Sequence, residues 1–131
     1  MPALSHKLAD ALAEAVQESV SAPFNLEANG SAITVSRSGR VIGTVTAAEI
    51  ADDIDSRSEP ERLASATRAV LSAIQDLIVR STAEPWPSTK SGALPVPNAE
   101  VRETMLRIWF GDPATPAAEL PSLDIRKLVD W

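Results

Sequence analysis

The sequence contains no cysteine, no tyrosine and a single histidine. Without cysteine, the chain can form neither disulfides nor thiolate metal sites, and it has no thiol nucleophile. The histidine, His6, lies in the first turn of a predicted helix, where we expect an ordinary surface side chain. A Ser-His-Asp or Cys-His arrangement is therefore not expected, and the loose spacing of Ser88, Lys90 and Ser91 does not by itself indicate a Ser-Lys pair. We predict that the protein is not an enzyme.

Basic residues are also few. Twelve lysines and arginines stand against eighteen aspartates and glutamates, which gives a net charge of −6. Binding to nucleic acid depends on clustered basic residues that neutralise phosphates, and binding to an anionic membrane surface depends on similar clusters. Aromatic residues make up only 4% of the chain, which argues against a base-stacking platform. We therefore expect neither nucleic acid nor a membrane among the partners.

Long apolar runs are missing as well. No run approaches ~20 residues, the length that crosses a bilayer, and the N-terminus lacks the basic-then-apolar pattern of a secretory signal. We therefore expect a cytoplasmic protein. What is present is ordinary for a globular chain: 131 residues, of which 44% are apolar. This size predicts one domain over residues 1–131.

Apolar side chains recur at three- and four-residue spacing in two segments, which predicts two amphipathic helices. The first begins after the cap residue Ser5 and ends before Pro23. The second, over residues 58–83, begins with a capping box at residues 58–61. Its end is set by Pro85. The apolar stripes consist of Leu8, Ala11, Leu12, Ala15, Val16 and Val20 in the first helix and of Leu63, Ala66, Val70, Leu71, Ile74, Leu77 and Ile78 in the second.

Residues 24–46 alternate apolar and polar side chains, which predicts a three-stranded antiparallel meander. The first turn is predicted at Asn29-Gly30, a favoured two-residue hairpin loop. This loop would pair Leu26 with Ile33 and Phe24 with Val35, so that all four side chains share one face.

The second turn of the meander, at Ser38-Gly39, allows two registers. A two-residue loop places Ile42 on the core face. A three-residue loop with a bulge instead places Val41 and Val45 there and leaves Gly43 opposite Val35. We favour the second register because it buries two valines.

The C-terminal third is less regular. A long proline-rich loop is predicted over residues 84–98. Residues 100–110 fit either a helix or a strand, and their β-branched and aromatic finish favours the strand. Residues 116–122 then return as a partner strand, with Pro121 tolerated at the edge of the sheet. Residues 123–129 are expected to form a short final helix.

These elements predict an α+β fold. It contains an N-terminal helix, a three-stranded antiparallel meander, a long helix, a C-terminal two-stranded hairpin and a short helix, with the five strands in one sheet. This order resembles that of type III secretion chaperones and their relatives over nearly the whole chain. The resemblance implies a small, acidic, cytoplasmic, commonly homodimeric and non-catalytic protein that holds an extended client segment against apolar surface. It carries over no site residues.

The three tryptophans are the candidate partner-binding residues, because tryptophan is enriched in binding hot spots. Trp86 lies between two prolines in the long loop, where it either contacts a partner or pins the loop to the core. Trp109 and Phe110 point to opposite sides of a strand, so we expect one in the core and the other partly exposed. Trp131 is expected to dock on the body of the protein or on a second chain. We predict a protein-interaction module, similar to a chaperone or adaptor, that binds another protein or peptide segment, forms a homodimer and uses no cofactor.

The alternative is a divalent-metal or small-ligand protein that uses the acidic loop 49–61. Carboxylates at alternate positions, such as Asp53 and Asp55, suit Ca²⁺ or Mg²⁺. A calcium loop counted from Asp53 requires a glycine and a glutamate where Ser58 and Ala64 stand, so we favour a solvated loop without a metal. A small-molecule pocket between helix and sheet is a third hypothesis. The carboxylates of the loop are Glu49, Asp52, Asp53, Asp55, Glu59 and Glu61.

Overall fold

The computed structural model describes residues 4–20, 24–46, 59–84, 86–87 and 94–128. It confirms the α+β class, with two separate three-stranded antiparallel sheets ordered β1-β2-β3 and β4-β5-β6. The prediction of five strands in one sheet is therefore wrong, whereas the predicted C-terminal hairpin is present with one further strand beside it. In chain order the elements are α1 (Leu4–Ser19), β1 (Phe24–Asn29), β2 (Ala32–Arg37), β3 (Arg40–Thr46), α3 (Glu59–Thr82), β4 (Pro97–Arg102), β5 (Met105–Gly111), β6 (Pro116–Asp124) and α4 (Ile125–Leu128).

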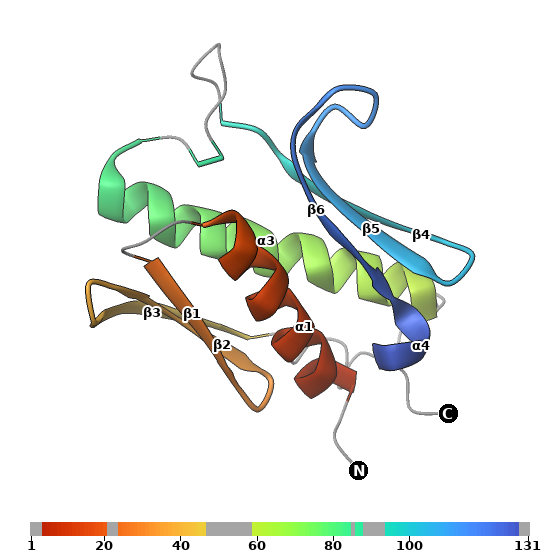
Figure 1. Ribbon diagram of the computed structural model, residues 1–131, viewed down its shortest axis with the longest axis horizontal. Helices are drawn as coiled ribbons and strands as arrows, with labels where there is room; N and C mark the ends of the chain where they lie inside the picture. The colour runs from red at the N-terminus through yellow and green to blue at the C-terminus, as the bar shows by residue number, and fades with distance from the viewer. Residues whose placement is uncertain (1–3, 21–23, 47–58, 85, 88–93, 129–131) are drawn as a thin grey trace.

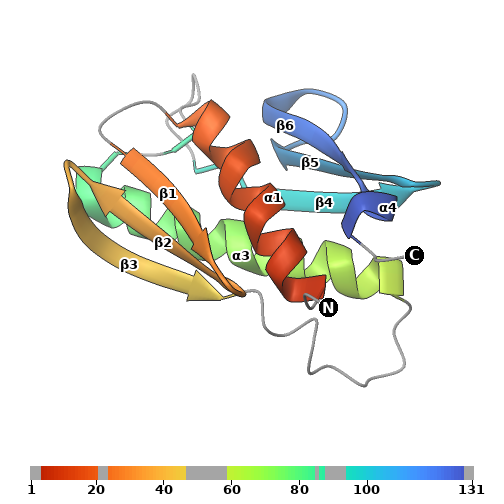
Figure 2. The same cartoon turned by 60° about the horizontal axis from the view of Figure 1, so that its bottom comes forward.

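The two long helices join the two sheets. In both views, α1 lies between the sheets, and α3 runs past both of them (Figure 1, Figure 2). Helix α1 contacts the edge strands β1 and β6, whereas α3 contacts the edge strands β3 and β4. Buried side chains from both helices and both sheets form one continuous hydrophobic core. No helix among the described residues is long and apolar enough to cross a bilayer.

Helix α1 buries more of its surface than its predicted stripe. Most of the stripe is buried as expected, and Ala9 and Ala13, which lie outside it, are buried too. Small side chains at these positions let the helix approach neighbours on more than one side. The helix begins at Leu4, so Ser5 lies inside it and is not its cap.

The register of the first hairpin differs from the predicted one by two residues. Leu26 pairs with Val35, and Asn29 pairs with Ala32, which leaves Gly30-Ser31 as the loop. Gly30 has a φ of 63°. A positive φ at the first loop position alone is the pattern of a type II′ turn, in which glycine is favoured at that position. A shift of two residues keeps every side chain on its predicted face.

The second hairpin combines features of both predicted registers. Its loop is the two-residue Ser38-Gly39, with φ of 53° and 81°, and the bulge lies further along, where Ile42 of β3 is the extra residue opposite Val35 and Ser36. Val45 is buried as predicted, but Val41 is 60% exposed. The bulge inside the strand, not a longer loop, absorbs the extra residue, so Val41 falls on the outer face.

Gly43 pairs with Val35, as predicted, and lies where α3 approaches β3. A Cβ atom at this position would come within 2.4 Å of Leu77 Cδ2 and 3.1 Å of Leu77 Cγ. The whole leucine side chain would have to move. We therefore expect Gly43→Ala to lower the free energy of unfolding by about 1–3 kcal/mol, the usual range for overpacking, measured by urea denaturation.

A double substitution identifies the cause of this effect. In a Leu77→Ala background, Gly43→Ala is expected to be close to neutral, because the obstructing atoms are gone. Gly39→Ala serves as the contrast: it would meet nothing within 4 Å but has a φ of +81°, so its effect comes from the backbone and should not depend on residue 77. Equal effects of Gly43→Ala in both backgrounds would contradict the packing explanation.

The long helix α3 confirms the predicted stripe. Its stripe residues are buried, apart from Leu77, which is partly exposed. The stripe also contains two buried polar side chains, Thr67 and Gln75. Thr67 Oγ1 donates to the Leu63 carbonyl within the helix at 2.7 Å. The predicted cap residue Ser58 lies outside the described residues.

The strand prediction for residues 100–110 is confirmed, but this segment belongs to two strands and not to one. A turn at Glu103-Thr104 separates β4 from β5, and Glu103 has a φ of 56°. Strand β4 begins at Pro97, so the predicted loop 84–98 extends too far. Pro97 and the charged residues that follow concealed this strand in the sequence, because proline is depleted in strands and tolerated mainly at an edge.

Strand β6 is an edge strand, as predicted, with an irregular register opposite β5. Leu106 pairs with Leu123 and Ile108 with Leu120, so β6 carries one extra residue beside Pro121. The short α4 follows at once. Its start is held by Asp124, whose Oδ1 accepts a hydrogen bond from the Arg126 backbone N–H at 3.0 Å, as expected for a helix cap.

Candidate binding groove between α1 and β6

Trp86 packs on the core. Its ring meets that of Phe110 edge to face, with centroids 5.4 Å apart and an interplanar angle of 72°. Its backbone carbonyl and that of Pro95 both accept hydrogen bonds from Gln75 Nε2, at 3.0 and 2.7 Å. Of the two interpretations of Trp86, these contacts support the one in which it pins the connection after α3 to the core.

Trp109 is covered by its own sheet. Although it points away from Phe110, only 6% of it is exposed, which differs from the expected partial exposure. The Arg107 guanidinium lies 4.6 Å from the centre of its ring, and Trp109 Nε1 donates to the Gly111 carbonyl at 3.1 Å. Arg107 therefore covers one face of this ring.

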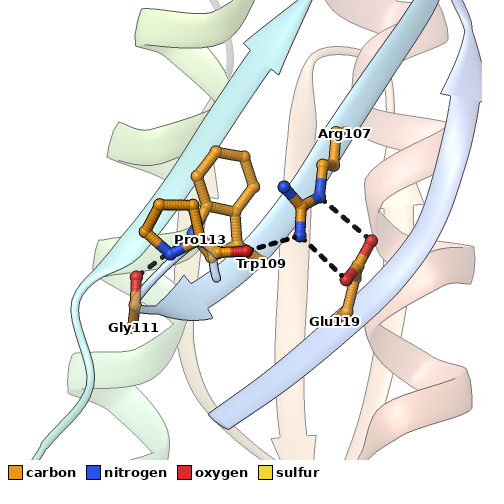
Figure 3. A network of polar contacts seen from close by, with 5 residues as sticks. All are labelled: Arg107, Trp109, Gly111, Pro113 and Glu119. Carbon is orange, nitrogen blue, oxygen red and sulfur yellow. Dashed lines mark hydrogen bonds and ion pairs between the residues drawn. The ribbon is translucent and has the colours of Figure 1, made fainter. Parts of the chain in front are cut away.

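Arg107 is held in place by three further contacts (Figure 3). It pairs with both carboxylate oxygens of Glu119 at 3.2 Å and donates to the Pro113 carbonyl at 3.0 Å. The hydrogen bond from Arg107 lowers the pKa of the Glu119 carboxyl below its ordinary value. These contacts hold the Arg107 guanidinium on the outer face of the second sheet, where Glu119 and the Pro113 carbonyl accept its hydrogen bonds.

Several predicted site residues lie outside the described part of the chain. They include Trp131, the Ser88, Lys90 and Ser91 segment, and residues 49–58 of the acidic loop. Of that loop, Glu61 is described as an exposed side chain on α3. Within the described residues, no group of three or more histidine, cysteine, aspartate or glutamate side chains is placed to hold a metal ion.

Helix side chains occupy the outer edges of two strands. Gln17 of α1 accepts a hydrogen bond from the Leu26 N–H at 2.6 Å and donates to the Phe24 carbonyl at 3.1 Å, so it pairs with β1 as a neighbouring strand would. On α3, Arg68 Nη1 donates to the Ala99 carbonyl of β4 at 2.9 Å. These contacts block the pairing of further strands at both edges. The sequence did not predict these contacts, because Gln17 and Arg68 have the residue types that are ordinary on the solvent-facing side of a helix.

The outer edge of β6 is different. Helix α1 lies beside it, but the side chains of residues 8–19 of α1 make no hydrogen bond to this strand. A groove of about 240 Å³ runs between the two elements. Its lining, which defines the α1–β6 groove, consists of Ala11, Glu14, Ala15 and Glu18 from α1 and Pro121, Leu123 and Asp124 from β6.

The groove has an apolar floor and an acidic rim. The two alanines, Pro121 and Leu123 supply the floor. At the rim, Asp124 is already paired with Arg126 at 2.9 Å. Glu14 and Glu18 are exposed, and within the described part of the chain neither has an ion-pair or hydrogen-bond partner.

The positions of these two glutamates disfavour the helical state of α1. They lie one turn apart, where like charges destabilise a helix. Glu18 also lies in the last turn, where the helix dipole disfavours negative charge. Because packing does not explain the two carboxylates, the α1–β6 groove is the best candidate for a functional site.

A second hollow of about 320 Å³ lies between α3 and β4. It has the same helix-and-edge arrangement as the α1–β6 groove. Here, however, Arg68 both lines the hollow and bonds to the strand edge. The lining also mixes acidic, basic and hydroxyl side chains with apolar ones, so it presents no single charge for a ligand to recognise.

No protein-family model matches the chain, and no curated protein or solved structure is significantly similar to it. The resemblance to type III secretion chaperones therefore stays a prediction that rests on the order of the elements.

Proposed function

We propose that this protein is a non-catalytic interaction module that binds a segment of another protein in the α1–β6 groove. The observation that carries the proposal is the groove itself. It lies at a strand edge to which the side chains of residues 8–19 of α1 make no hydrogen bond, and its rim holds two glutamates whose charges disfavour their own helix.

The size of the groove supports a protein segment over a small molecule. Pockets for drug-sized ligands are enclosed and occupy roughly 300–1,000 Å³, whereas this groove measures about 240 Å³. That space accommodates one or two side chains of a segment whose backbone stays at the surface. The chaperone-like or adaptor-like role expected from the order of elements is consistent with such binding. The alternative, a metal or small ligand at the acidic loop 49–61, concerns residues that lie mostly outside the described part of the chain.

A substitution that fills the groove tests the proposal. Peptides are first selected on the full chain from a random 12-residue phage-displayed library, and their affinities are measured by fluorescence anisotropy. Ala11→Leu adds bulk at a partly exposed position of the floor, and we expect it to weaken binding at least about tenfold, or about 1.4 kcal/mol. Ala11→Gln is a second blocking variant with a polar end.

The matched control places the same bulk elsewhere. Ala69→Leu changes an exposed alanine on α3, outside the groove, and is expected to leave the affinities unchanged. Thermal unfolding of each variant confirms that the fold is retained. If the selected peptides bind the Ala11 variants as well as the unchanged protein, or if no peptide is selected at all, the proposed function is wrong.

A further inference from the structure

We infer that the occupant of the α1–β6 groove is an extended segment with lysine or arginine at alternate positions. This inference rests on the proposed function and specifies its partner. The aliphatic stems of the basic side chains would lie on the apolar floor, and their charged ends would reach the carboxylates of Glu14 and Glu18.

The chemistry of the groove matches a long basic side chain. Lysine and arginine bury their methylene stems along apolar surface while they keep the charged end in water. The floor formed by Ala11, Ala15 and Pro121 is apolar and made of compact side chains, and the carboxylates at the rim are exposed. A stem in the groove therefore brings the cation to the rim without burial of its charge, which avoids the desolvation penalty of a buried ion pair.

The spacing of the acids indicates the spacing of the bases. Asp10, Glu14 and Glu18 follow one another at four-residue intervals on one helix and are all exposed. Four residues of helix rise about 6 Å, whereas two residues of extended chain span about 6.6 Å. Basic side chains at every second position of an extended segment would therefore face successive carboxylates.

The partner is a different protein and not a second copy of this chain. The chain itself carries a net charge of −6, and none of its twelve basic residues has another basic residue at position i+2. A second copy would bring repulsion and no matching pattern. An acidic segment would meet the same repulsion at the rim.

Three short synthetic peptides test the pattern. The first is Gly-Lys-Val-Lys-Val-Lys-Gly, blocked at both ends. The second has the same composition with the three lysines adjacent, and the third replaces each lysine by glutamine. In fluorescence anisotropy at low salt, we expect the alternating peptide to bind at least about tenfold more tightly than either control, as two or three aligned exposed ion pairs allow.

Charge reversal locates the effect. Glu14→Lys with Glu18→Lys is expected to weaken binding of the alternating peptide at least about tenfold, because attraction becomes repulsion. The matched control, Glu27→Lys with Asp76→Lys, changes two exposed acids on β1 and α3 and shifts the net charge equally. It should change the affinity less than twofold.

The outcomes separate this inference from the proposed function. Equal binding of the two isomeric peptides, or equal loss in the two charge-reversed variants, would show general attraction to an acidic protein and overturn the inference. Library peptides that are blocked by Ala11→Leu but contain no alternating basic residues would also overturn it, while the proposed function stands. If no peptide is sensitive to Ala11→Leu, the proposed function itself fails.

Discussion

Replacement of Gln75 by leucine is expected to lower the free energy of unfolding by about 2–4 kcal/mol. Only 3% of Gln75 is exposed, and its Nε2 donates to the carbonyls of Trp86 and Pro95 at 3.0 and 2.7 Å. Leucine has nearly the same volume but no donor, so two carbonyls at the connection after α3 would lose their partner. Urea denaturation followed by circular dichroism measures the change.

Two variants check this explanation. Gln75→Glu keeps the shape of the side chain, but its ionised carboxylate cannot donate to either carbonyl, so we expect a loss at least as large as that of Gln75→Leu at neutral pH. Ser72→Leu changes an exposed position of the same helix and should shift stability by less than about 0.5 kcal/mol. A stable Gln75→Leu protein would show that the two carbonyls do not depend on this side chain.

Phe110→Ala is expected to have the largest effect, a loss of about 3–5 kcal/mol. Phe110 is fully buried and is among the largest side chains of the core. Its removal leaves a cavity at the point where β5 meets the connection after α3. The comparison is Phe24→Ala, which removes the same ring from a partly exposed site beneath Arg37 and should lower stability less.

A double-mutant cycle tests whether Phe110 holds Trp86. The edge-to-face contact of the two rings is expected to give a coupling free energy of about 0.5–1.5 kcal/mol between Trp86→Ala and Phe110→Ala. Strictly additive losses would mean that Trp86 does not pin the connection, and Trp86 would return as a candidate contact for a partner.

The local pattern of the sequence determined much of the fold. Helical periodicity placed α1 and α3 and most of their buried side chains. The alternation of apolar and polar side chains predicted the meander, the burial of Val45 and the position of Gly43 opposite Val35. These features depend on the period of side chains along a helix or strand, which neighbouring residues set by themselves.

Register and strand boundaries were less accessible. The first hairpin shifted by two residues because Gly30 supplies a positive φ at the first loop position, a choice that several nearby loops could make. Strand β4 was missed because it begins with a proline and contains charged residues. Proline is tolerated mainly in edge strands, and the sequence does not show that this segment lies at the edge of a sheet. The division into two sheets depends on α1 lying between them, and no local pattern carries that information.

The candidate site was decided by the tertiary structure. The tryptophans were identified by residue type, but Trp86 packs on Phe110 and Trp109 lies beneath Arg107. The α1–β6 groove joins residues near both ends of the chain, and the sequence alone offered only an acidic, cysteine-free chain with two amphipathic helices. Composition fixes charge and chemistry because these belong to single residues, whereas a groove exists only where distant elements meet with a gap between them.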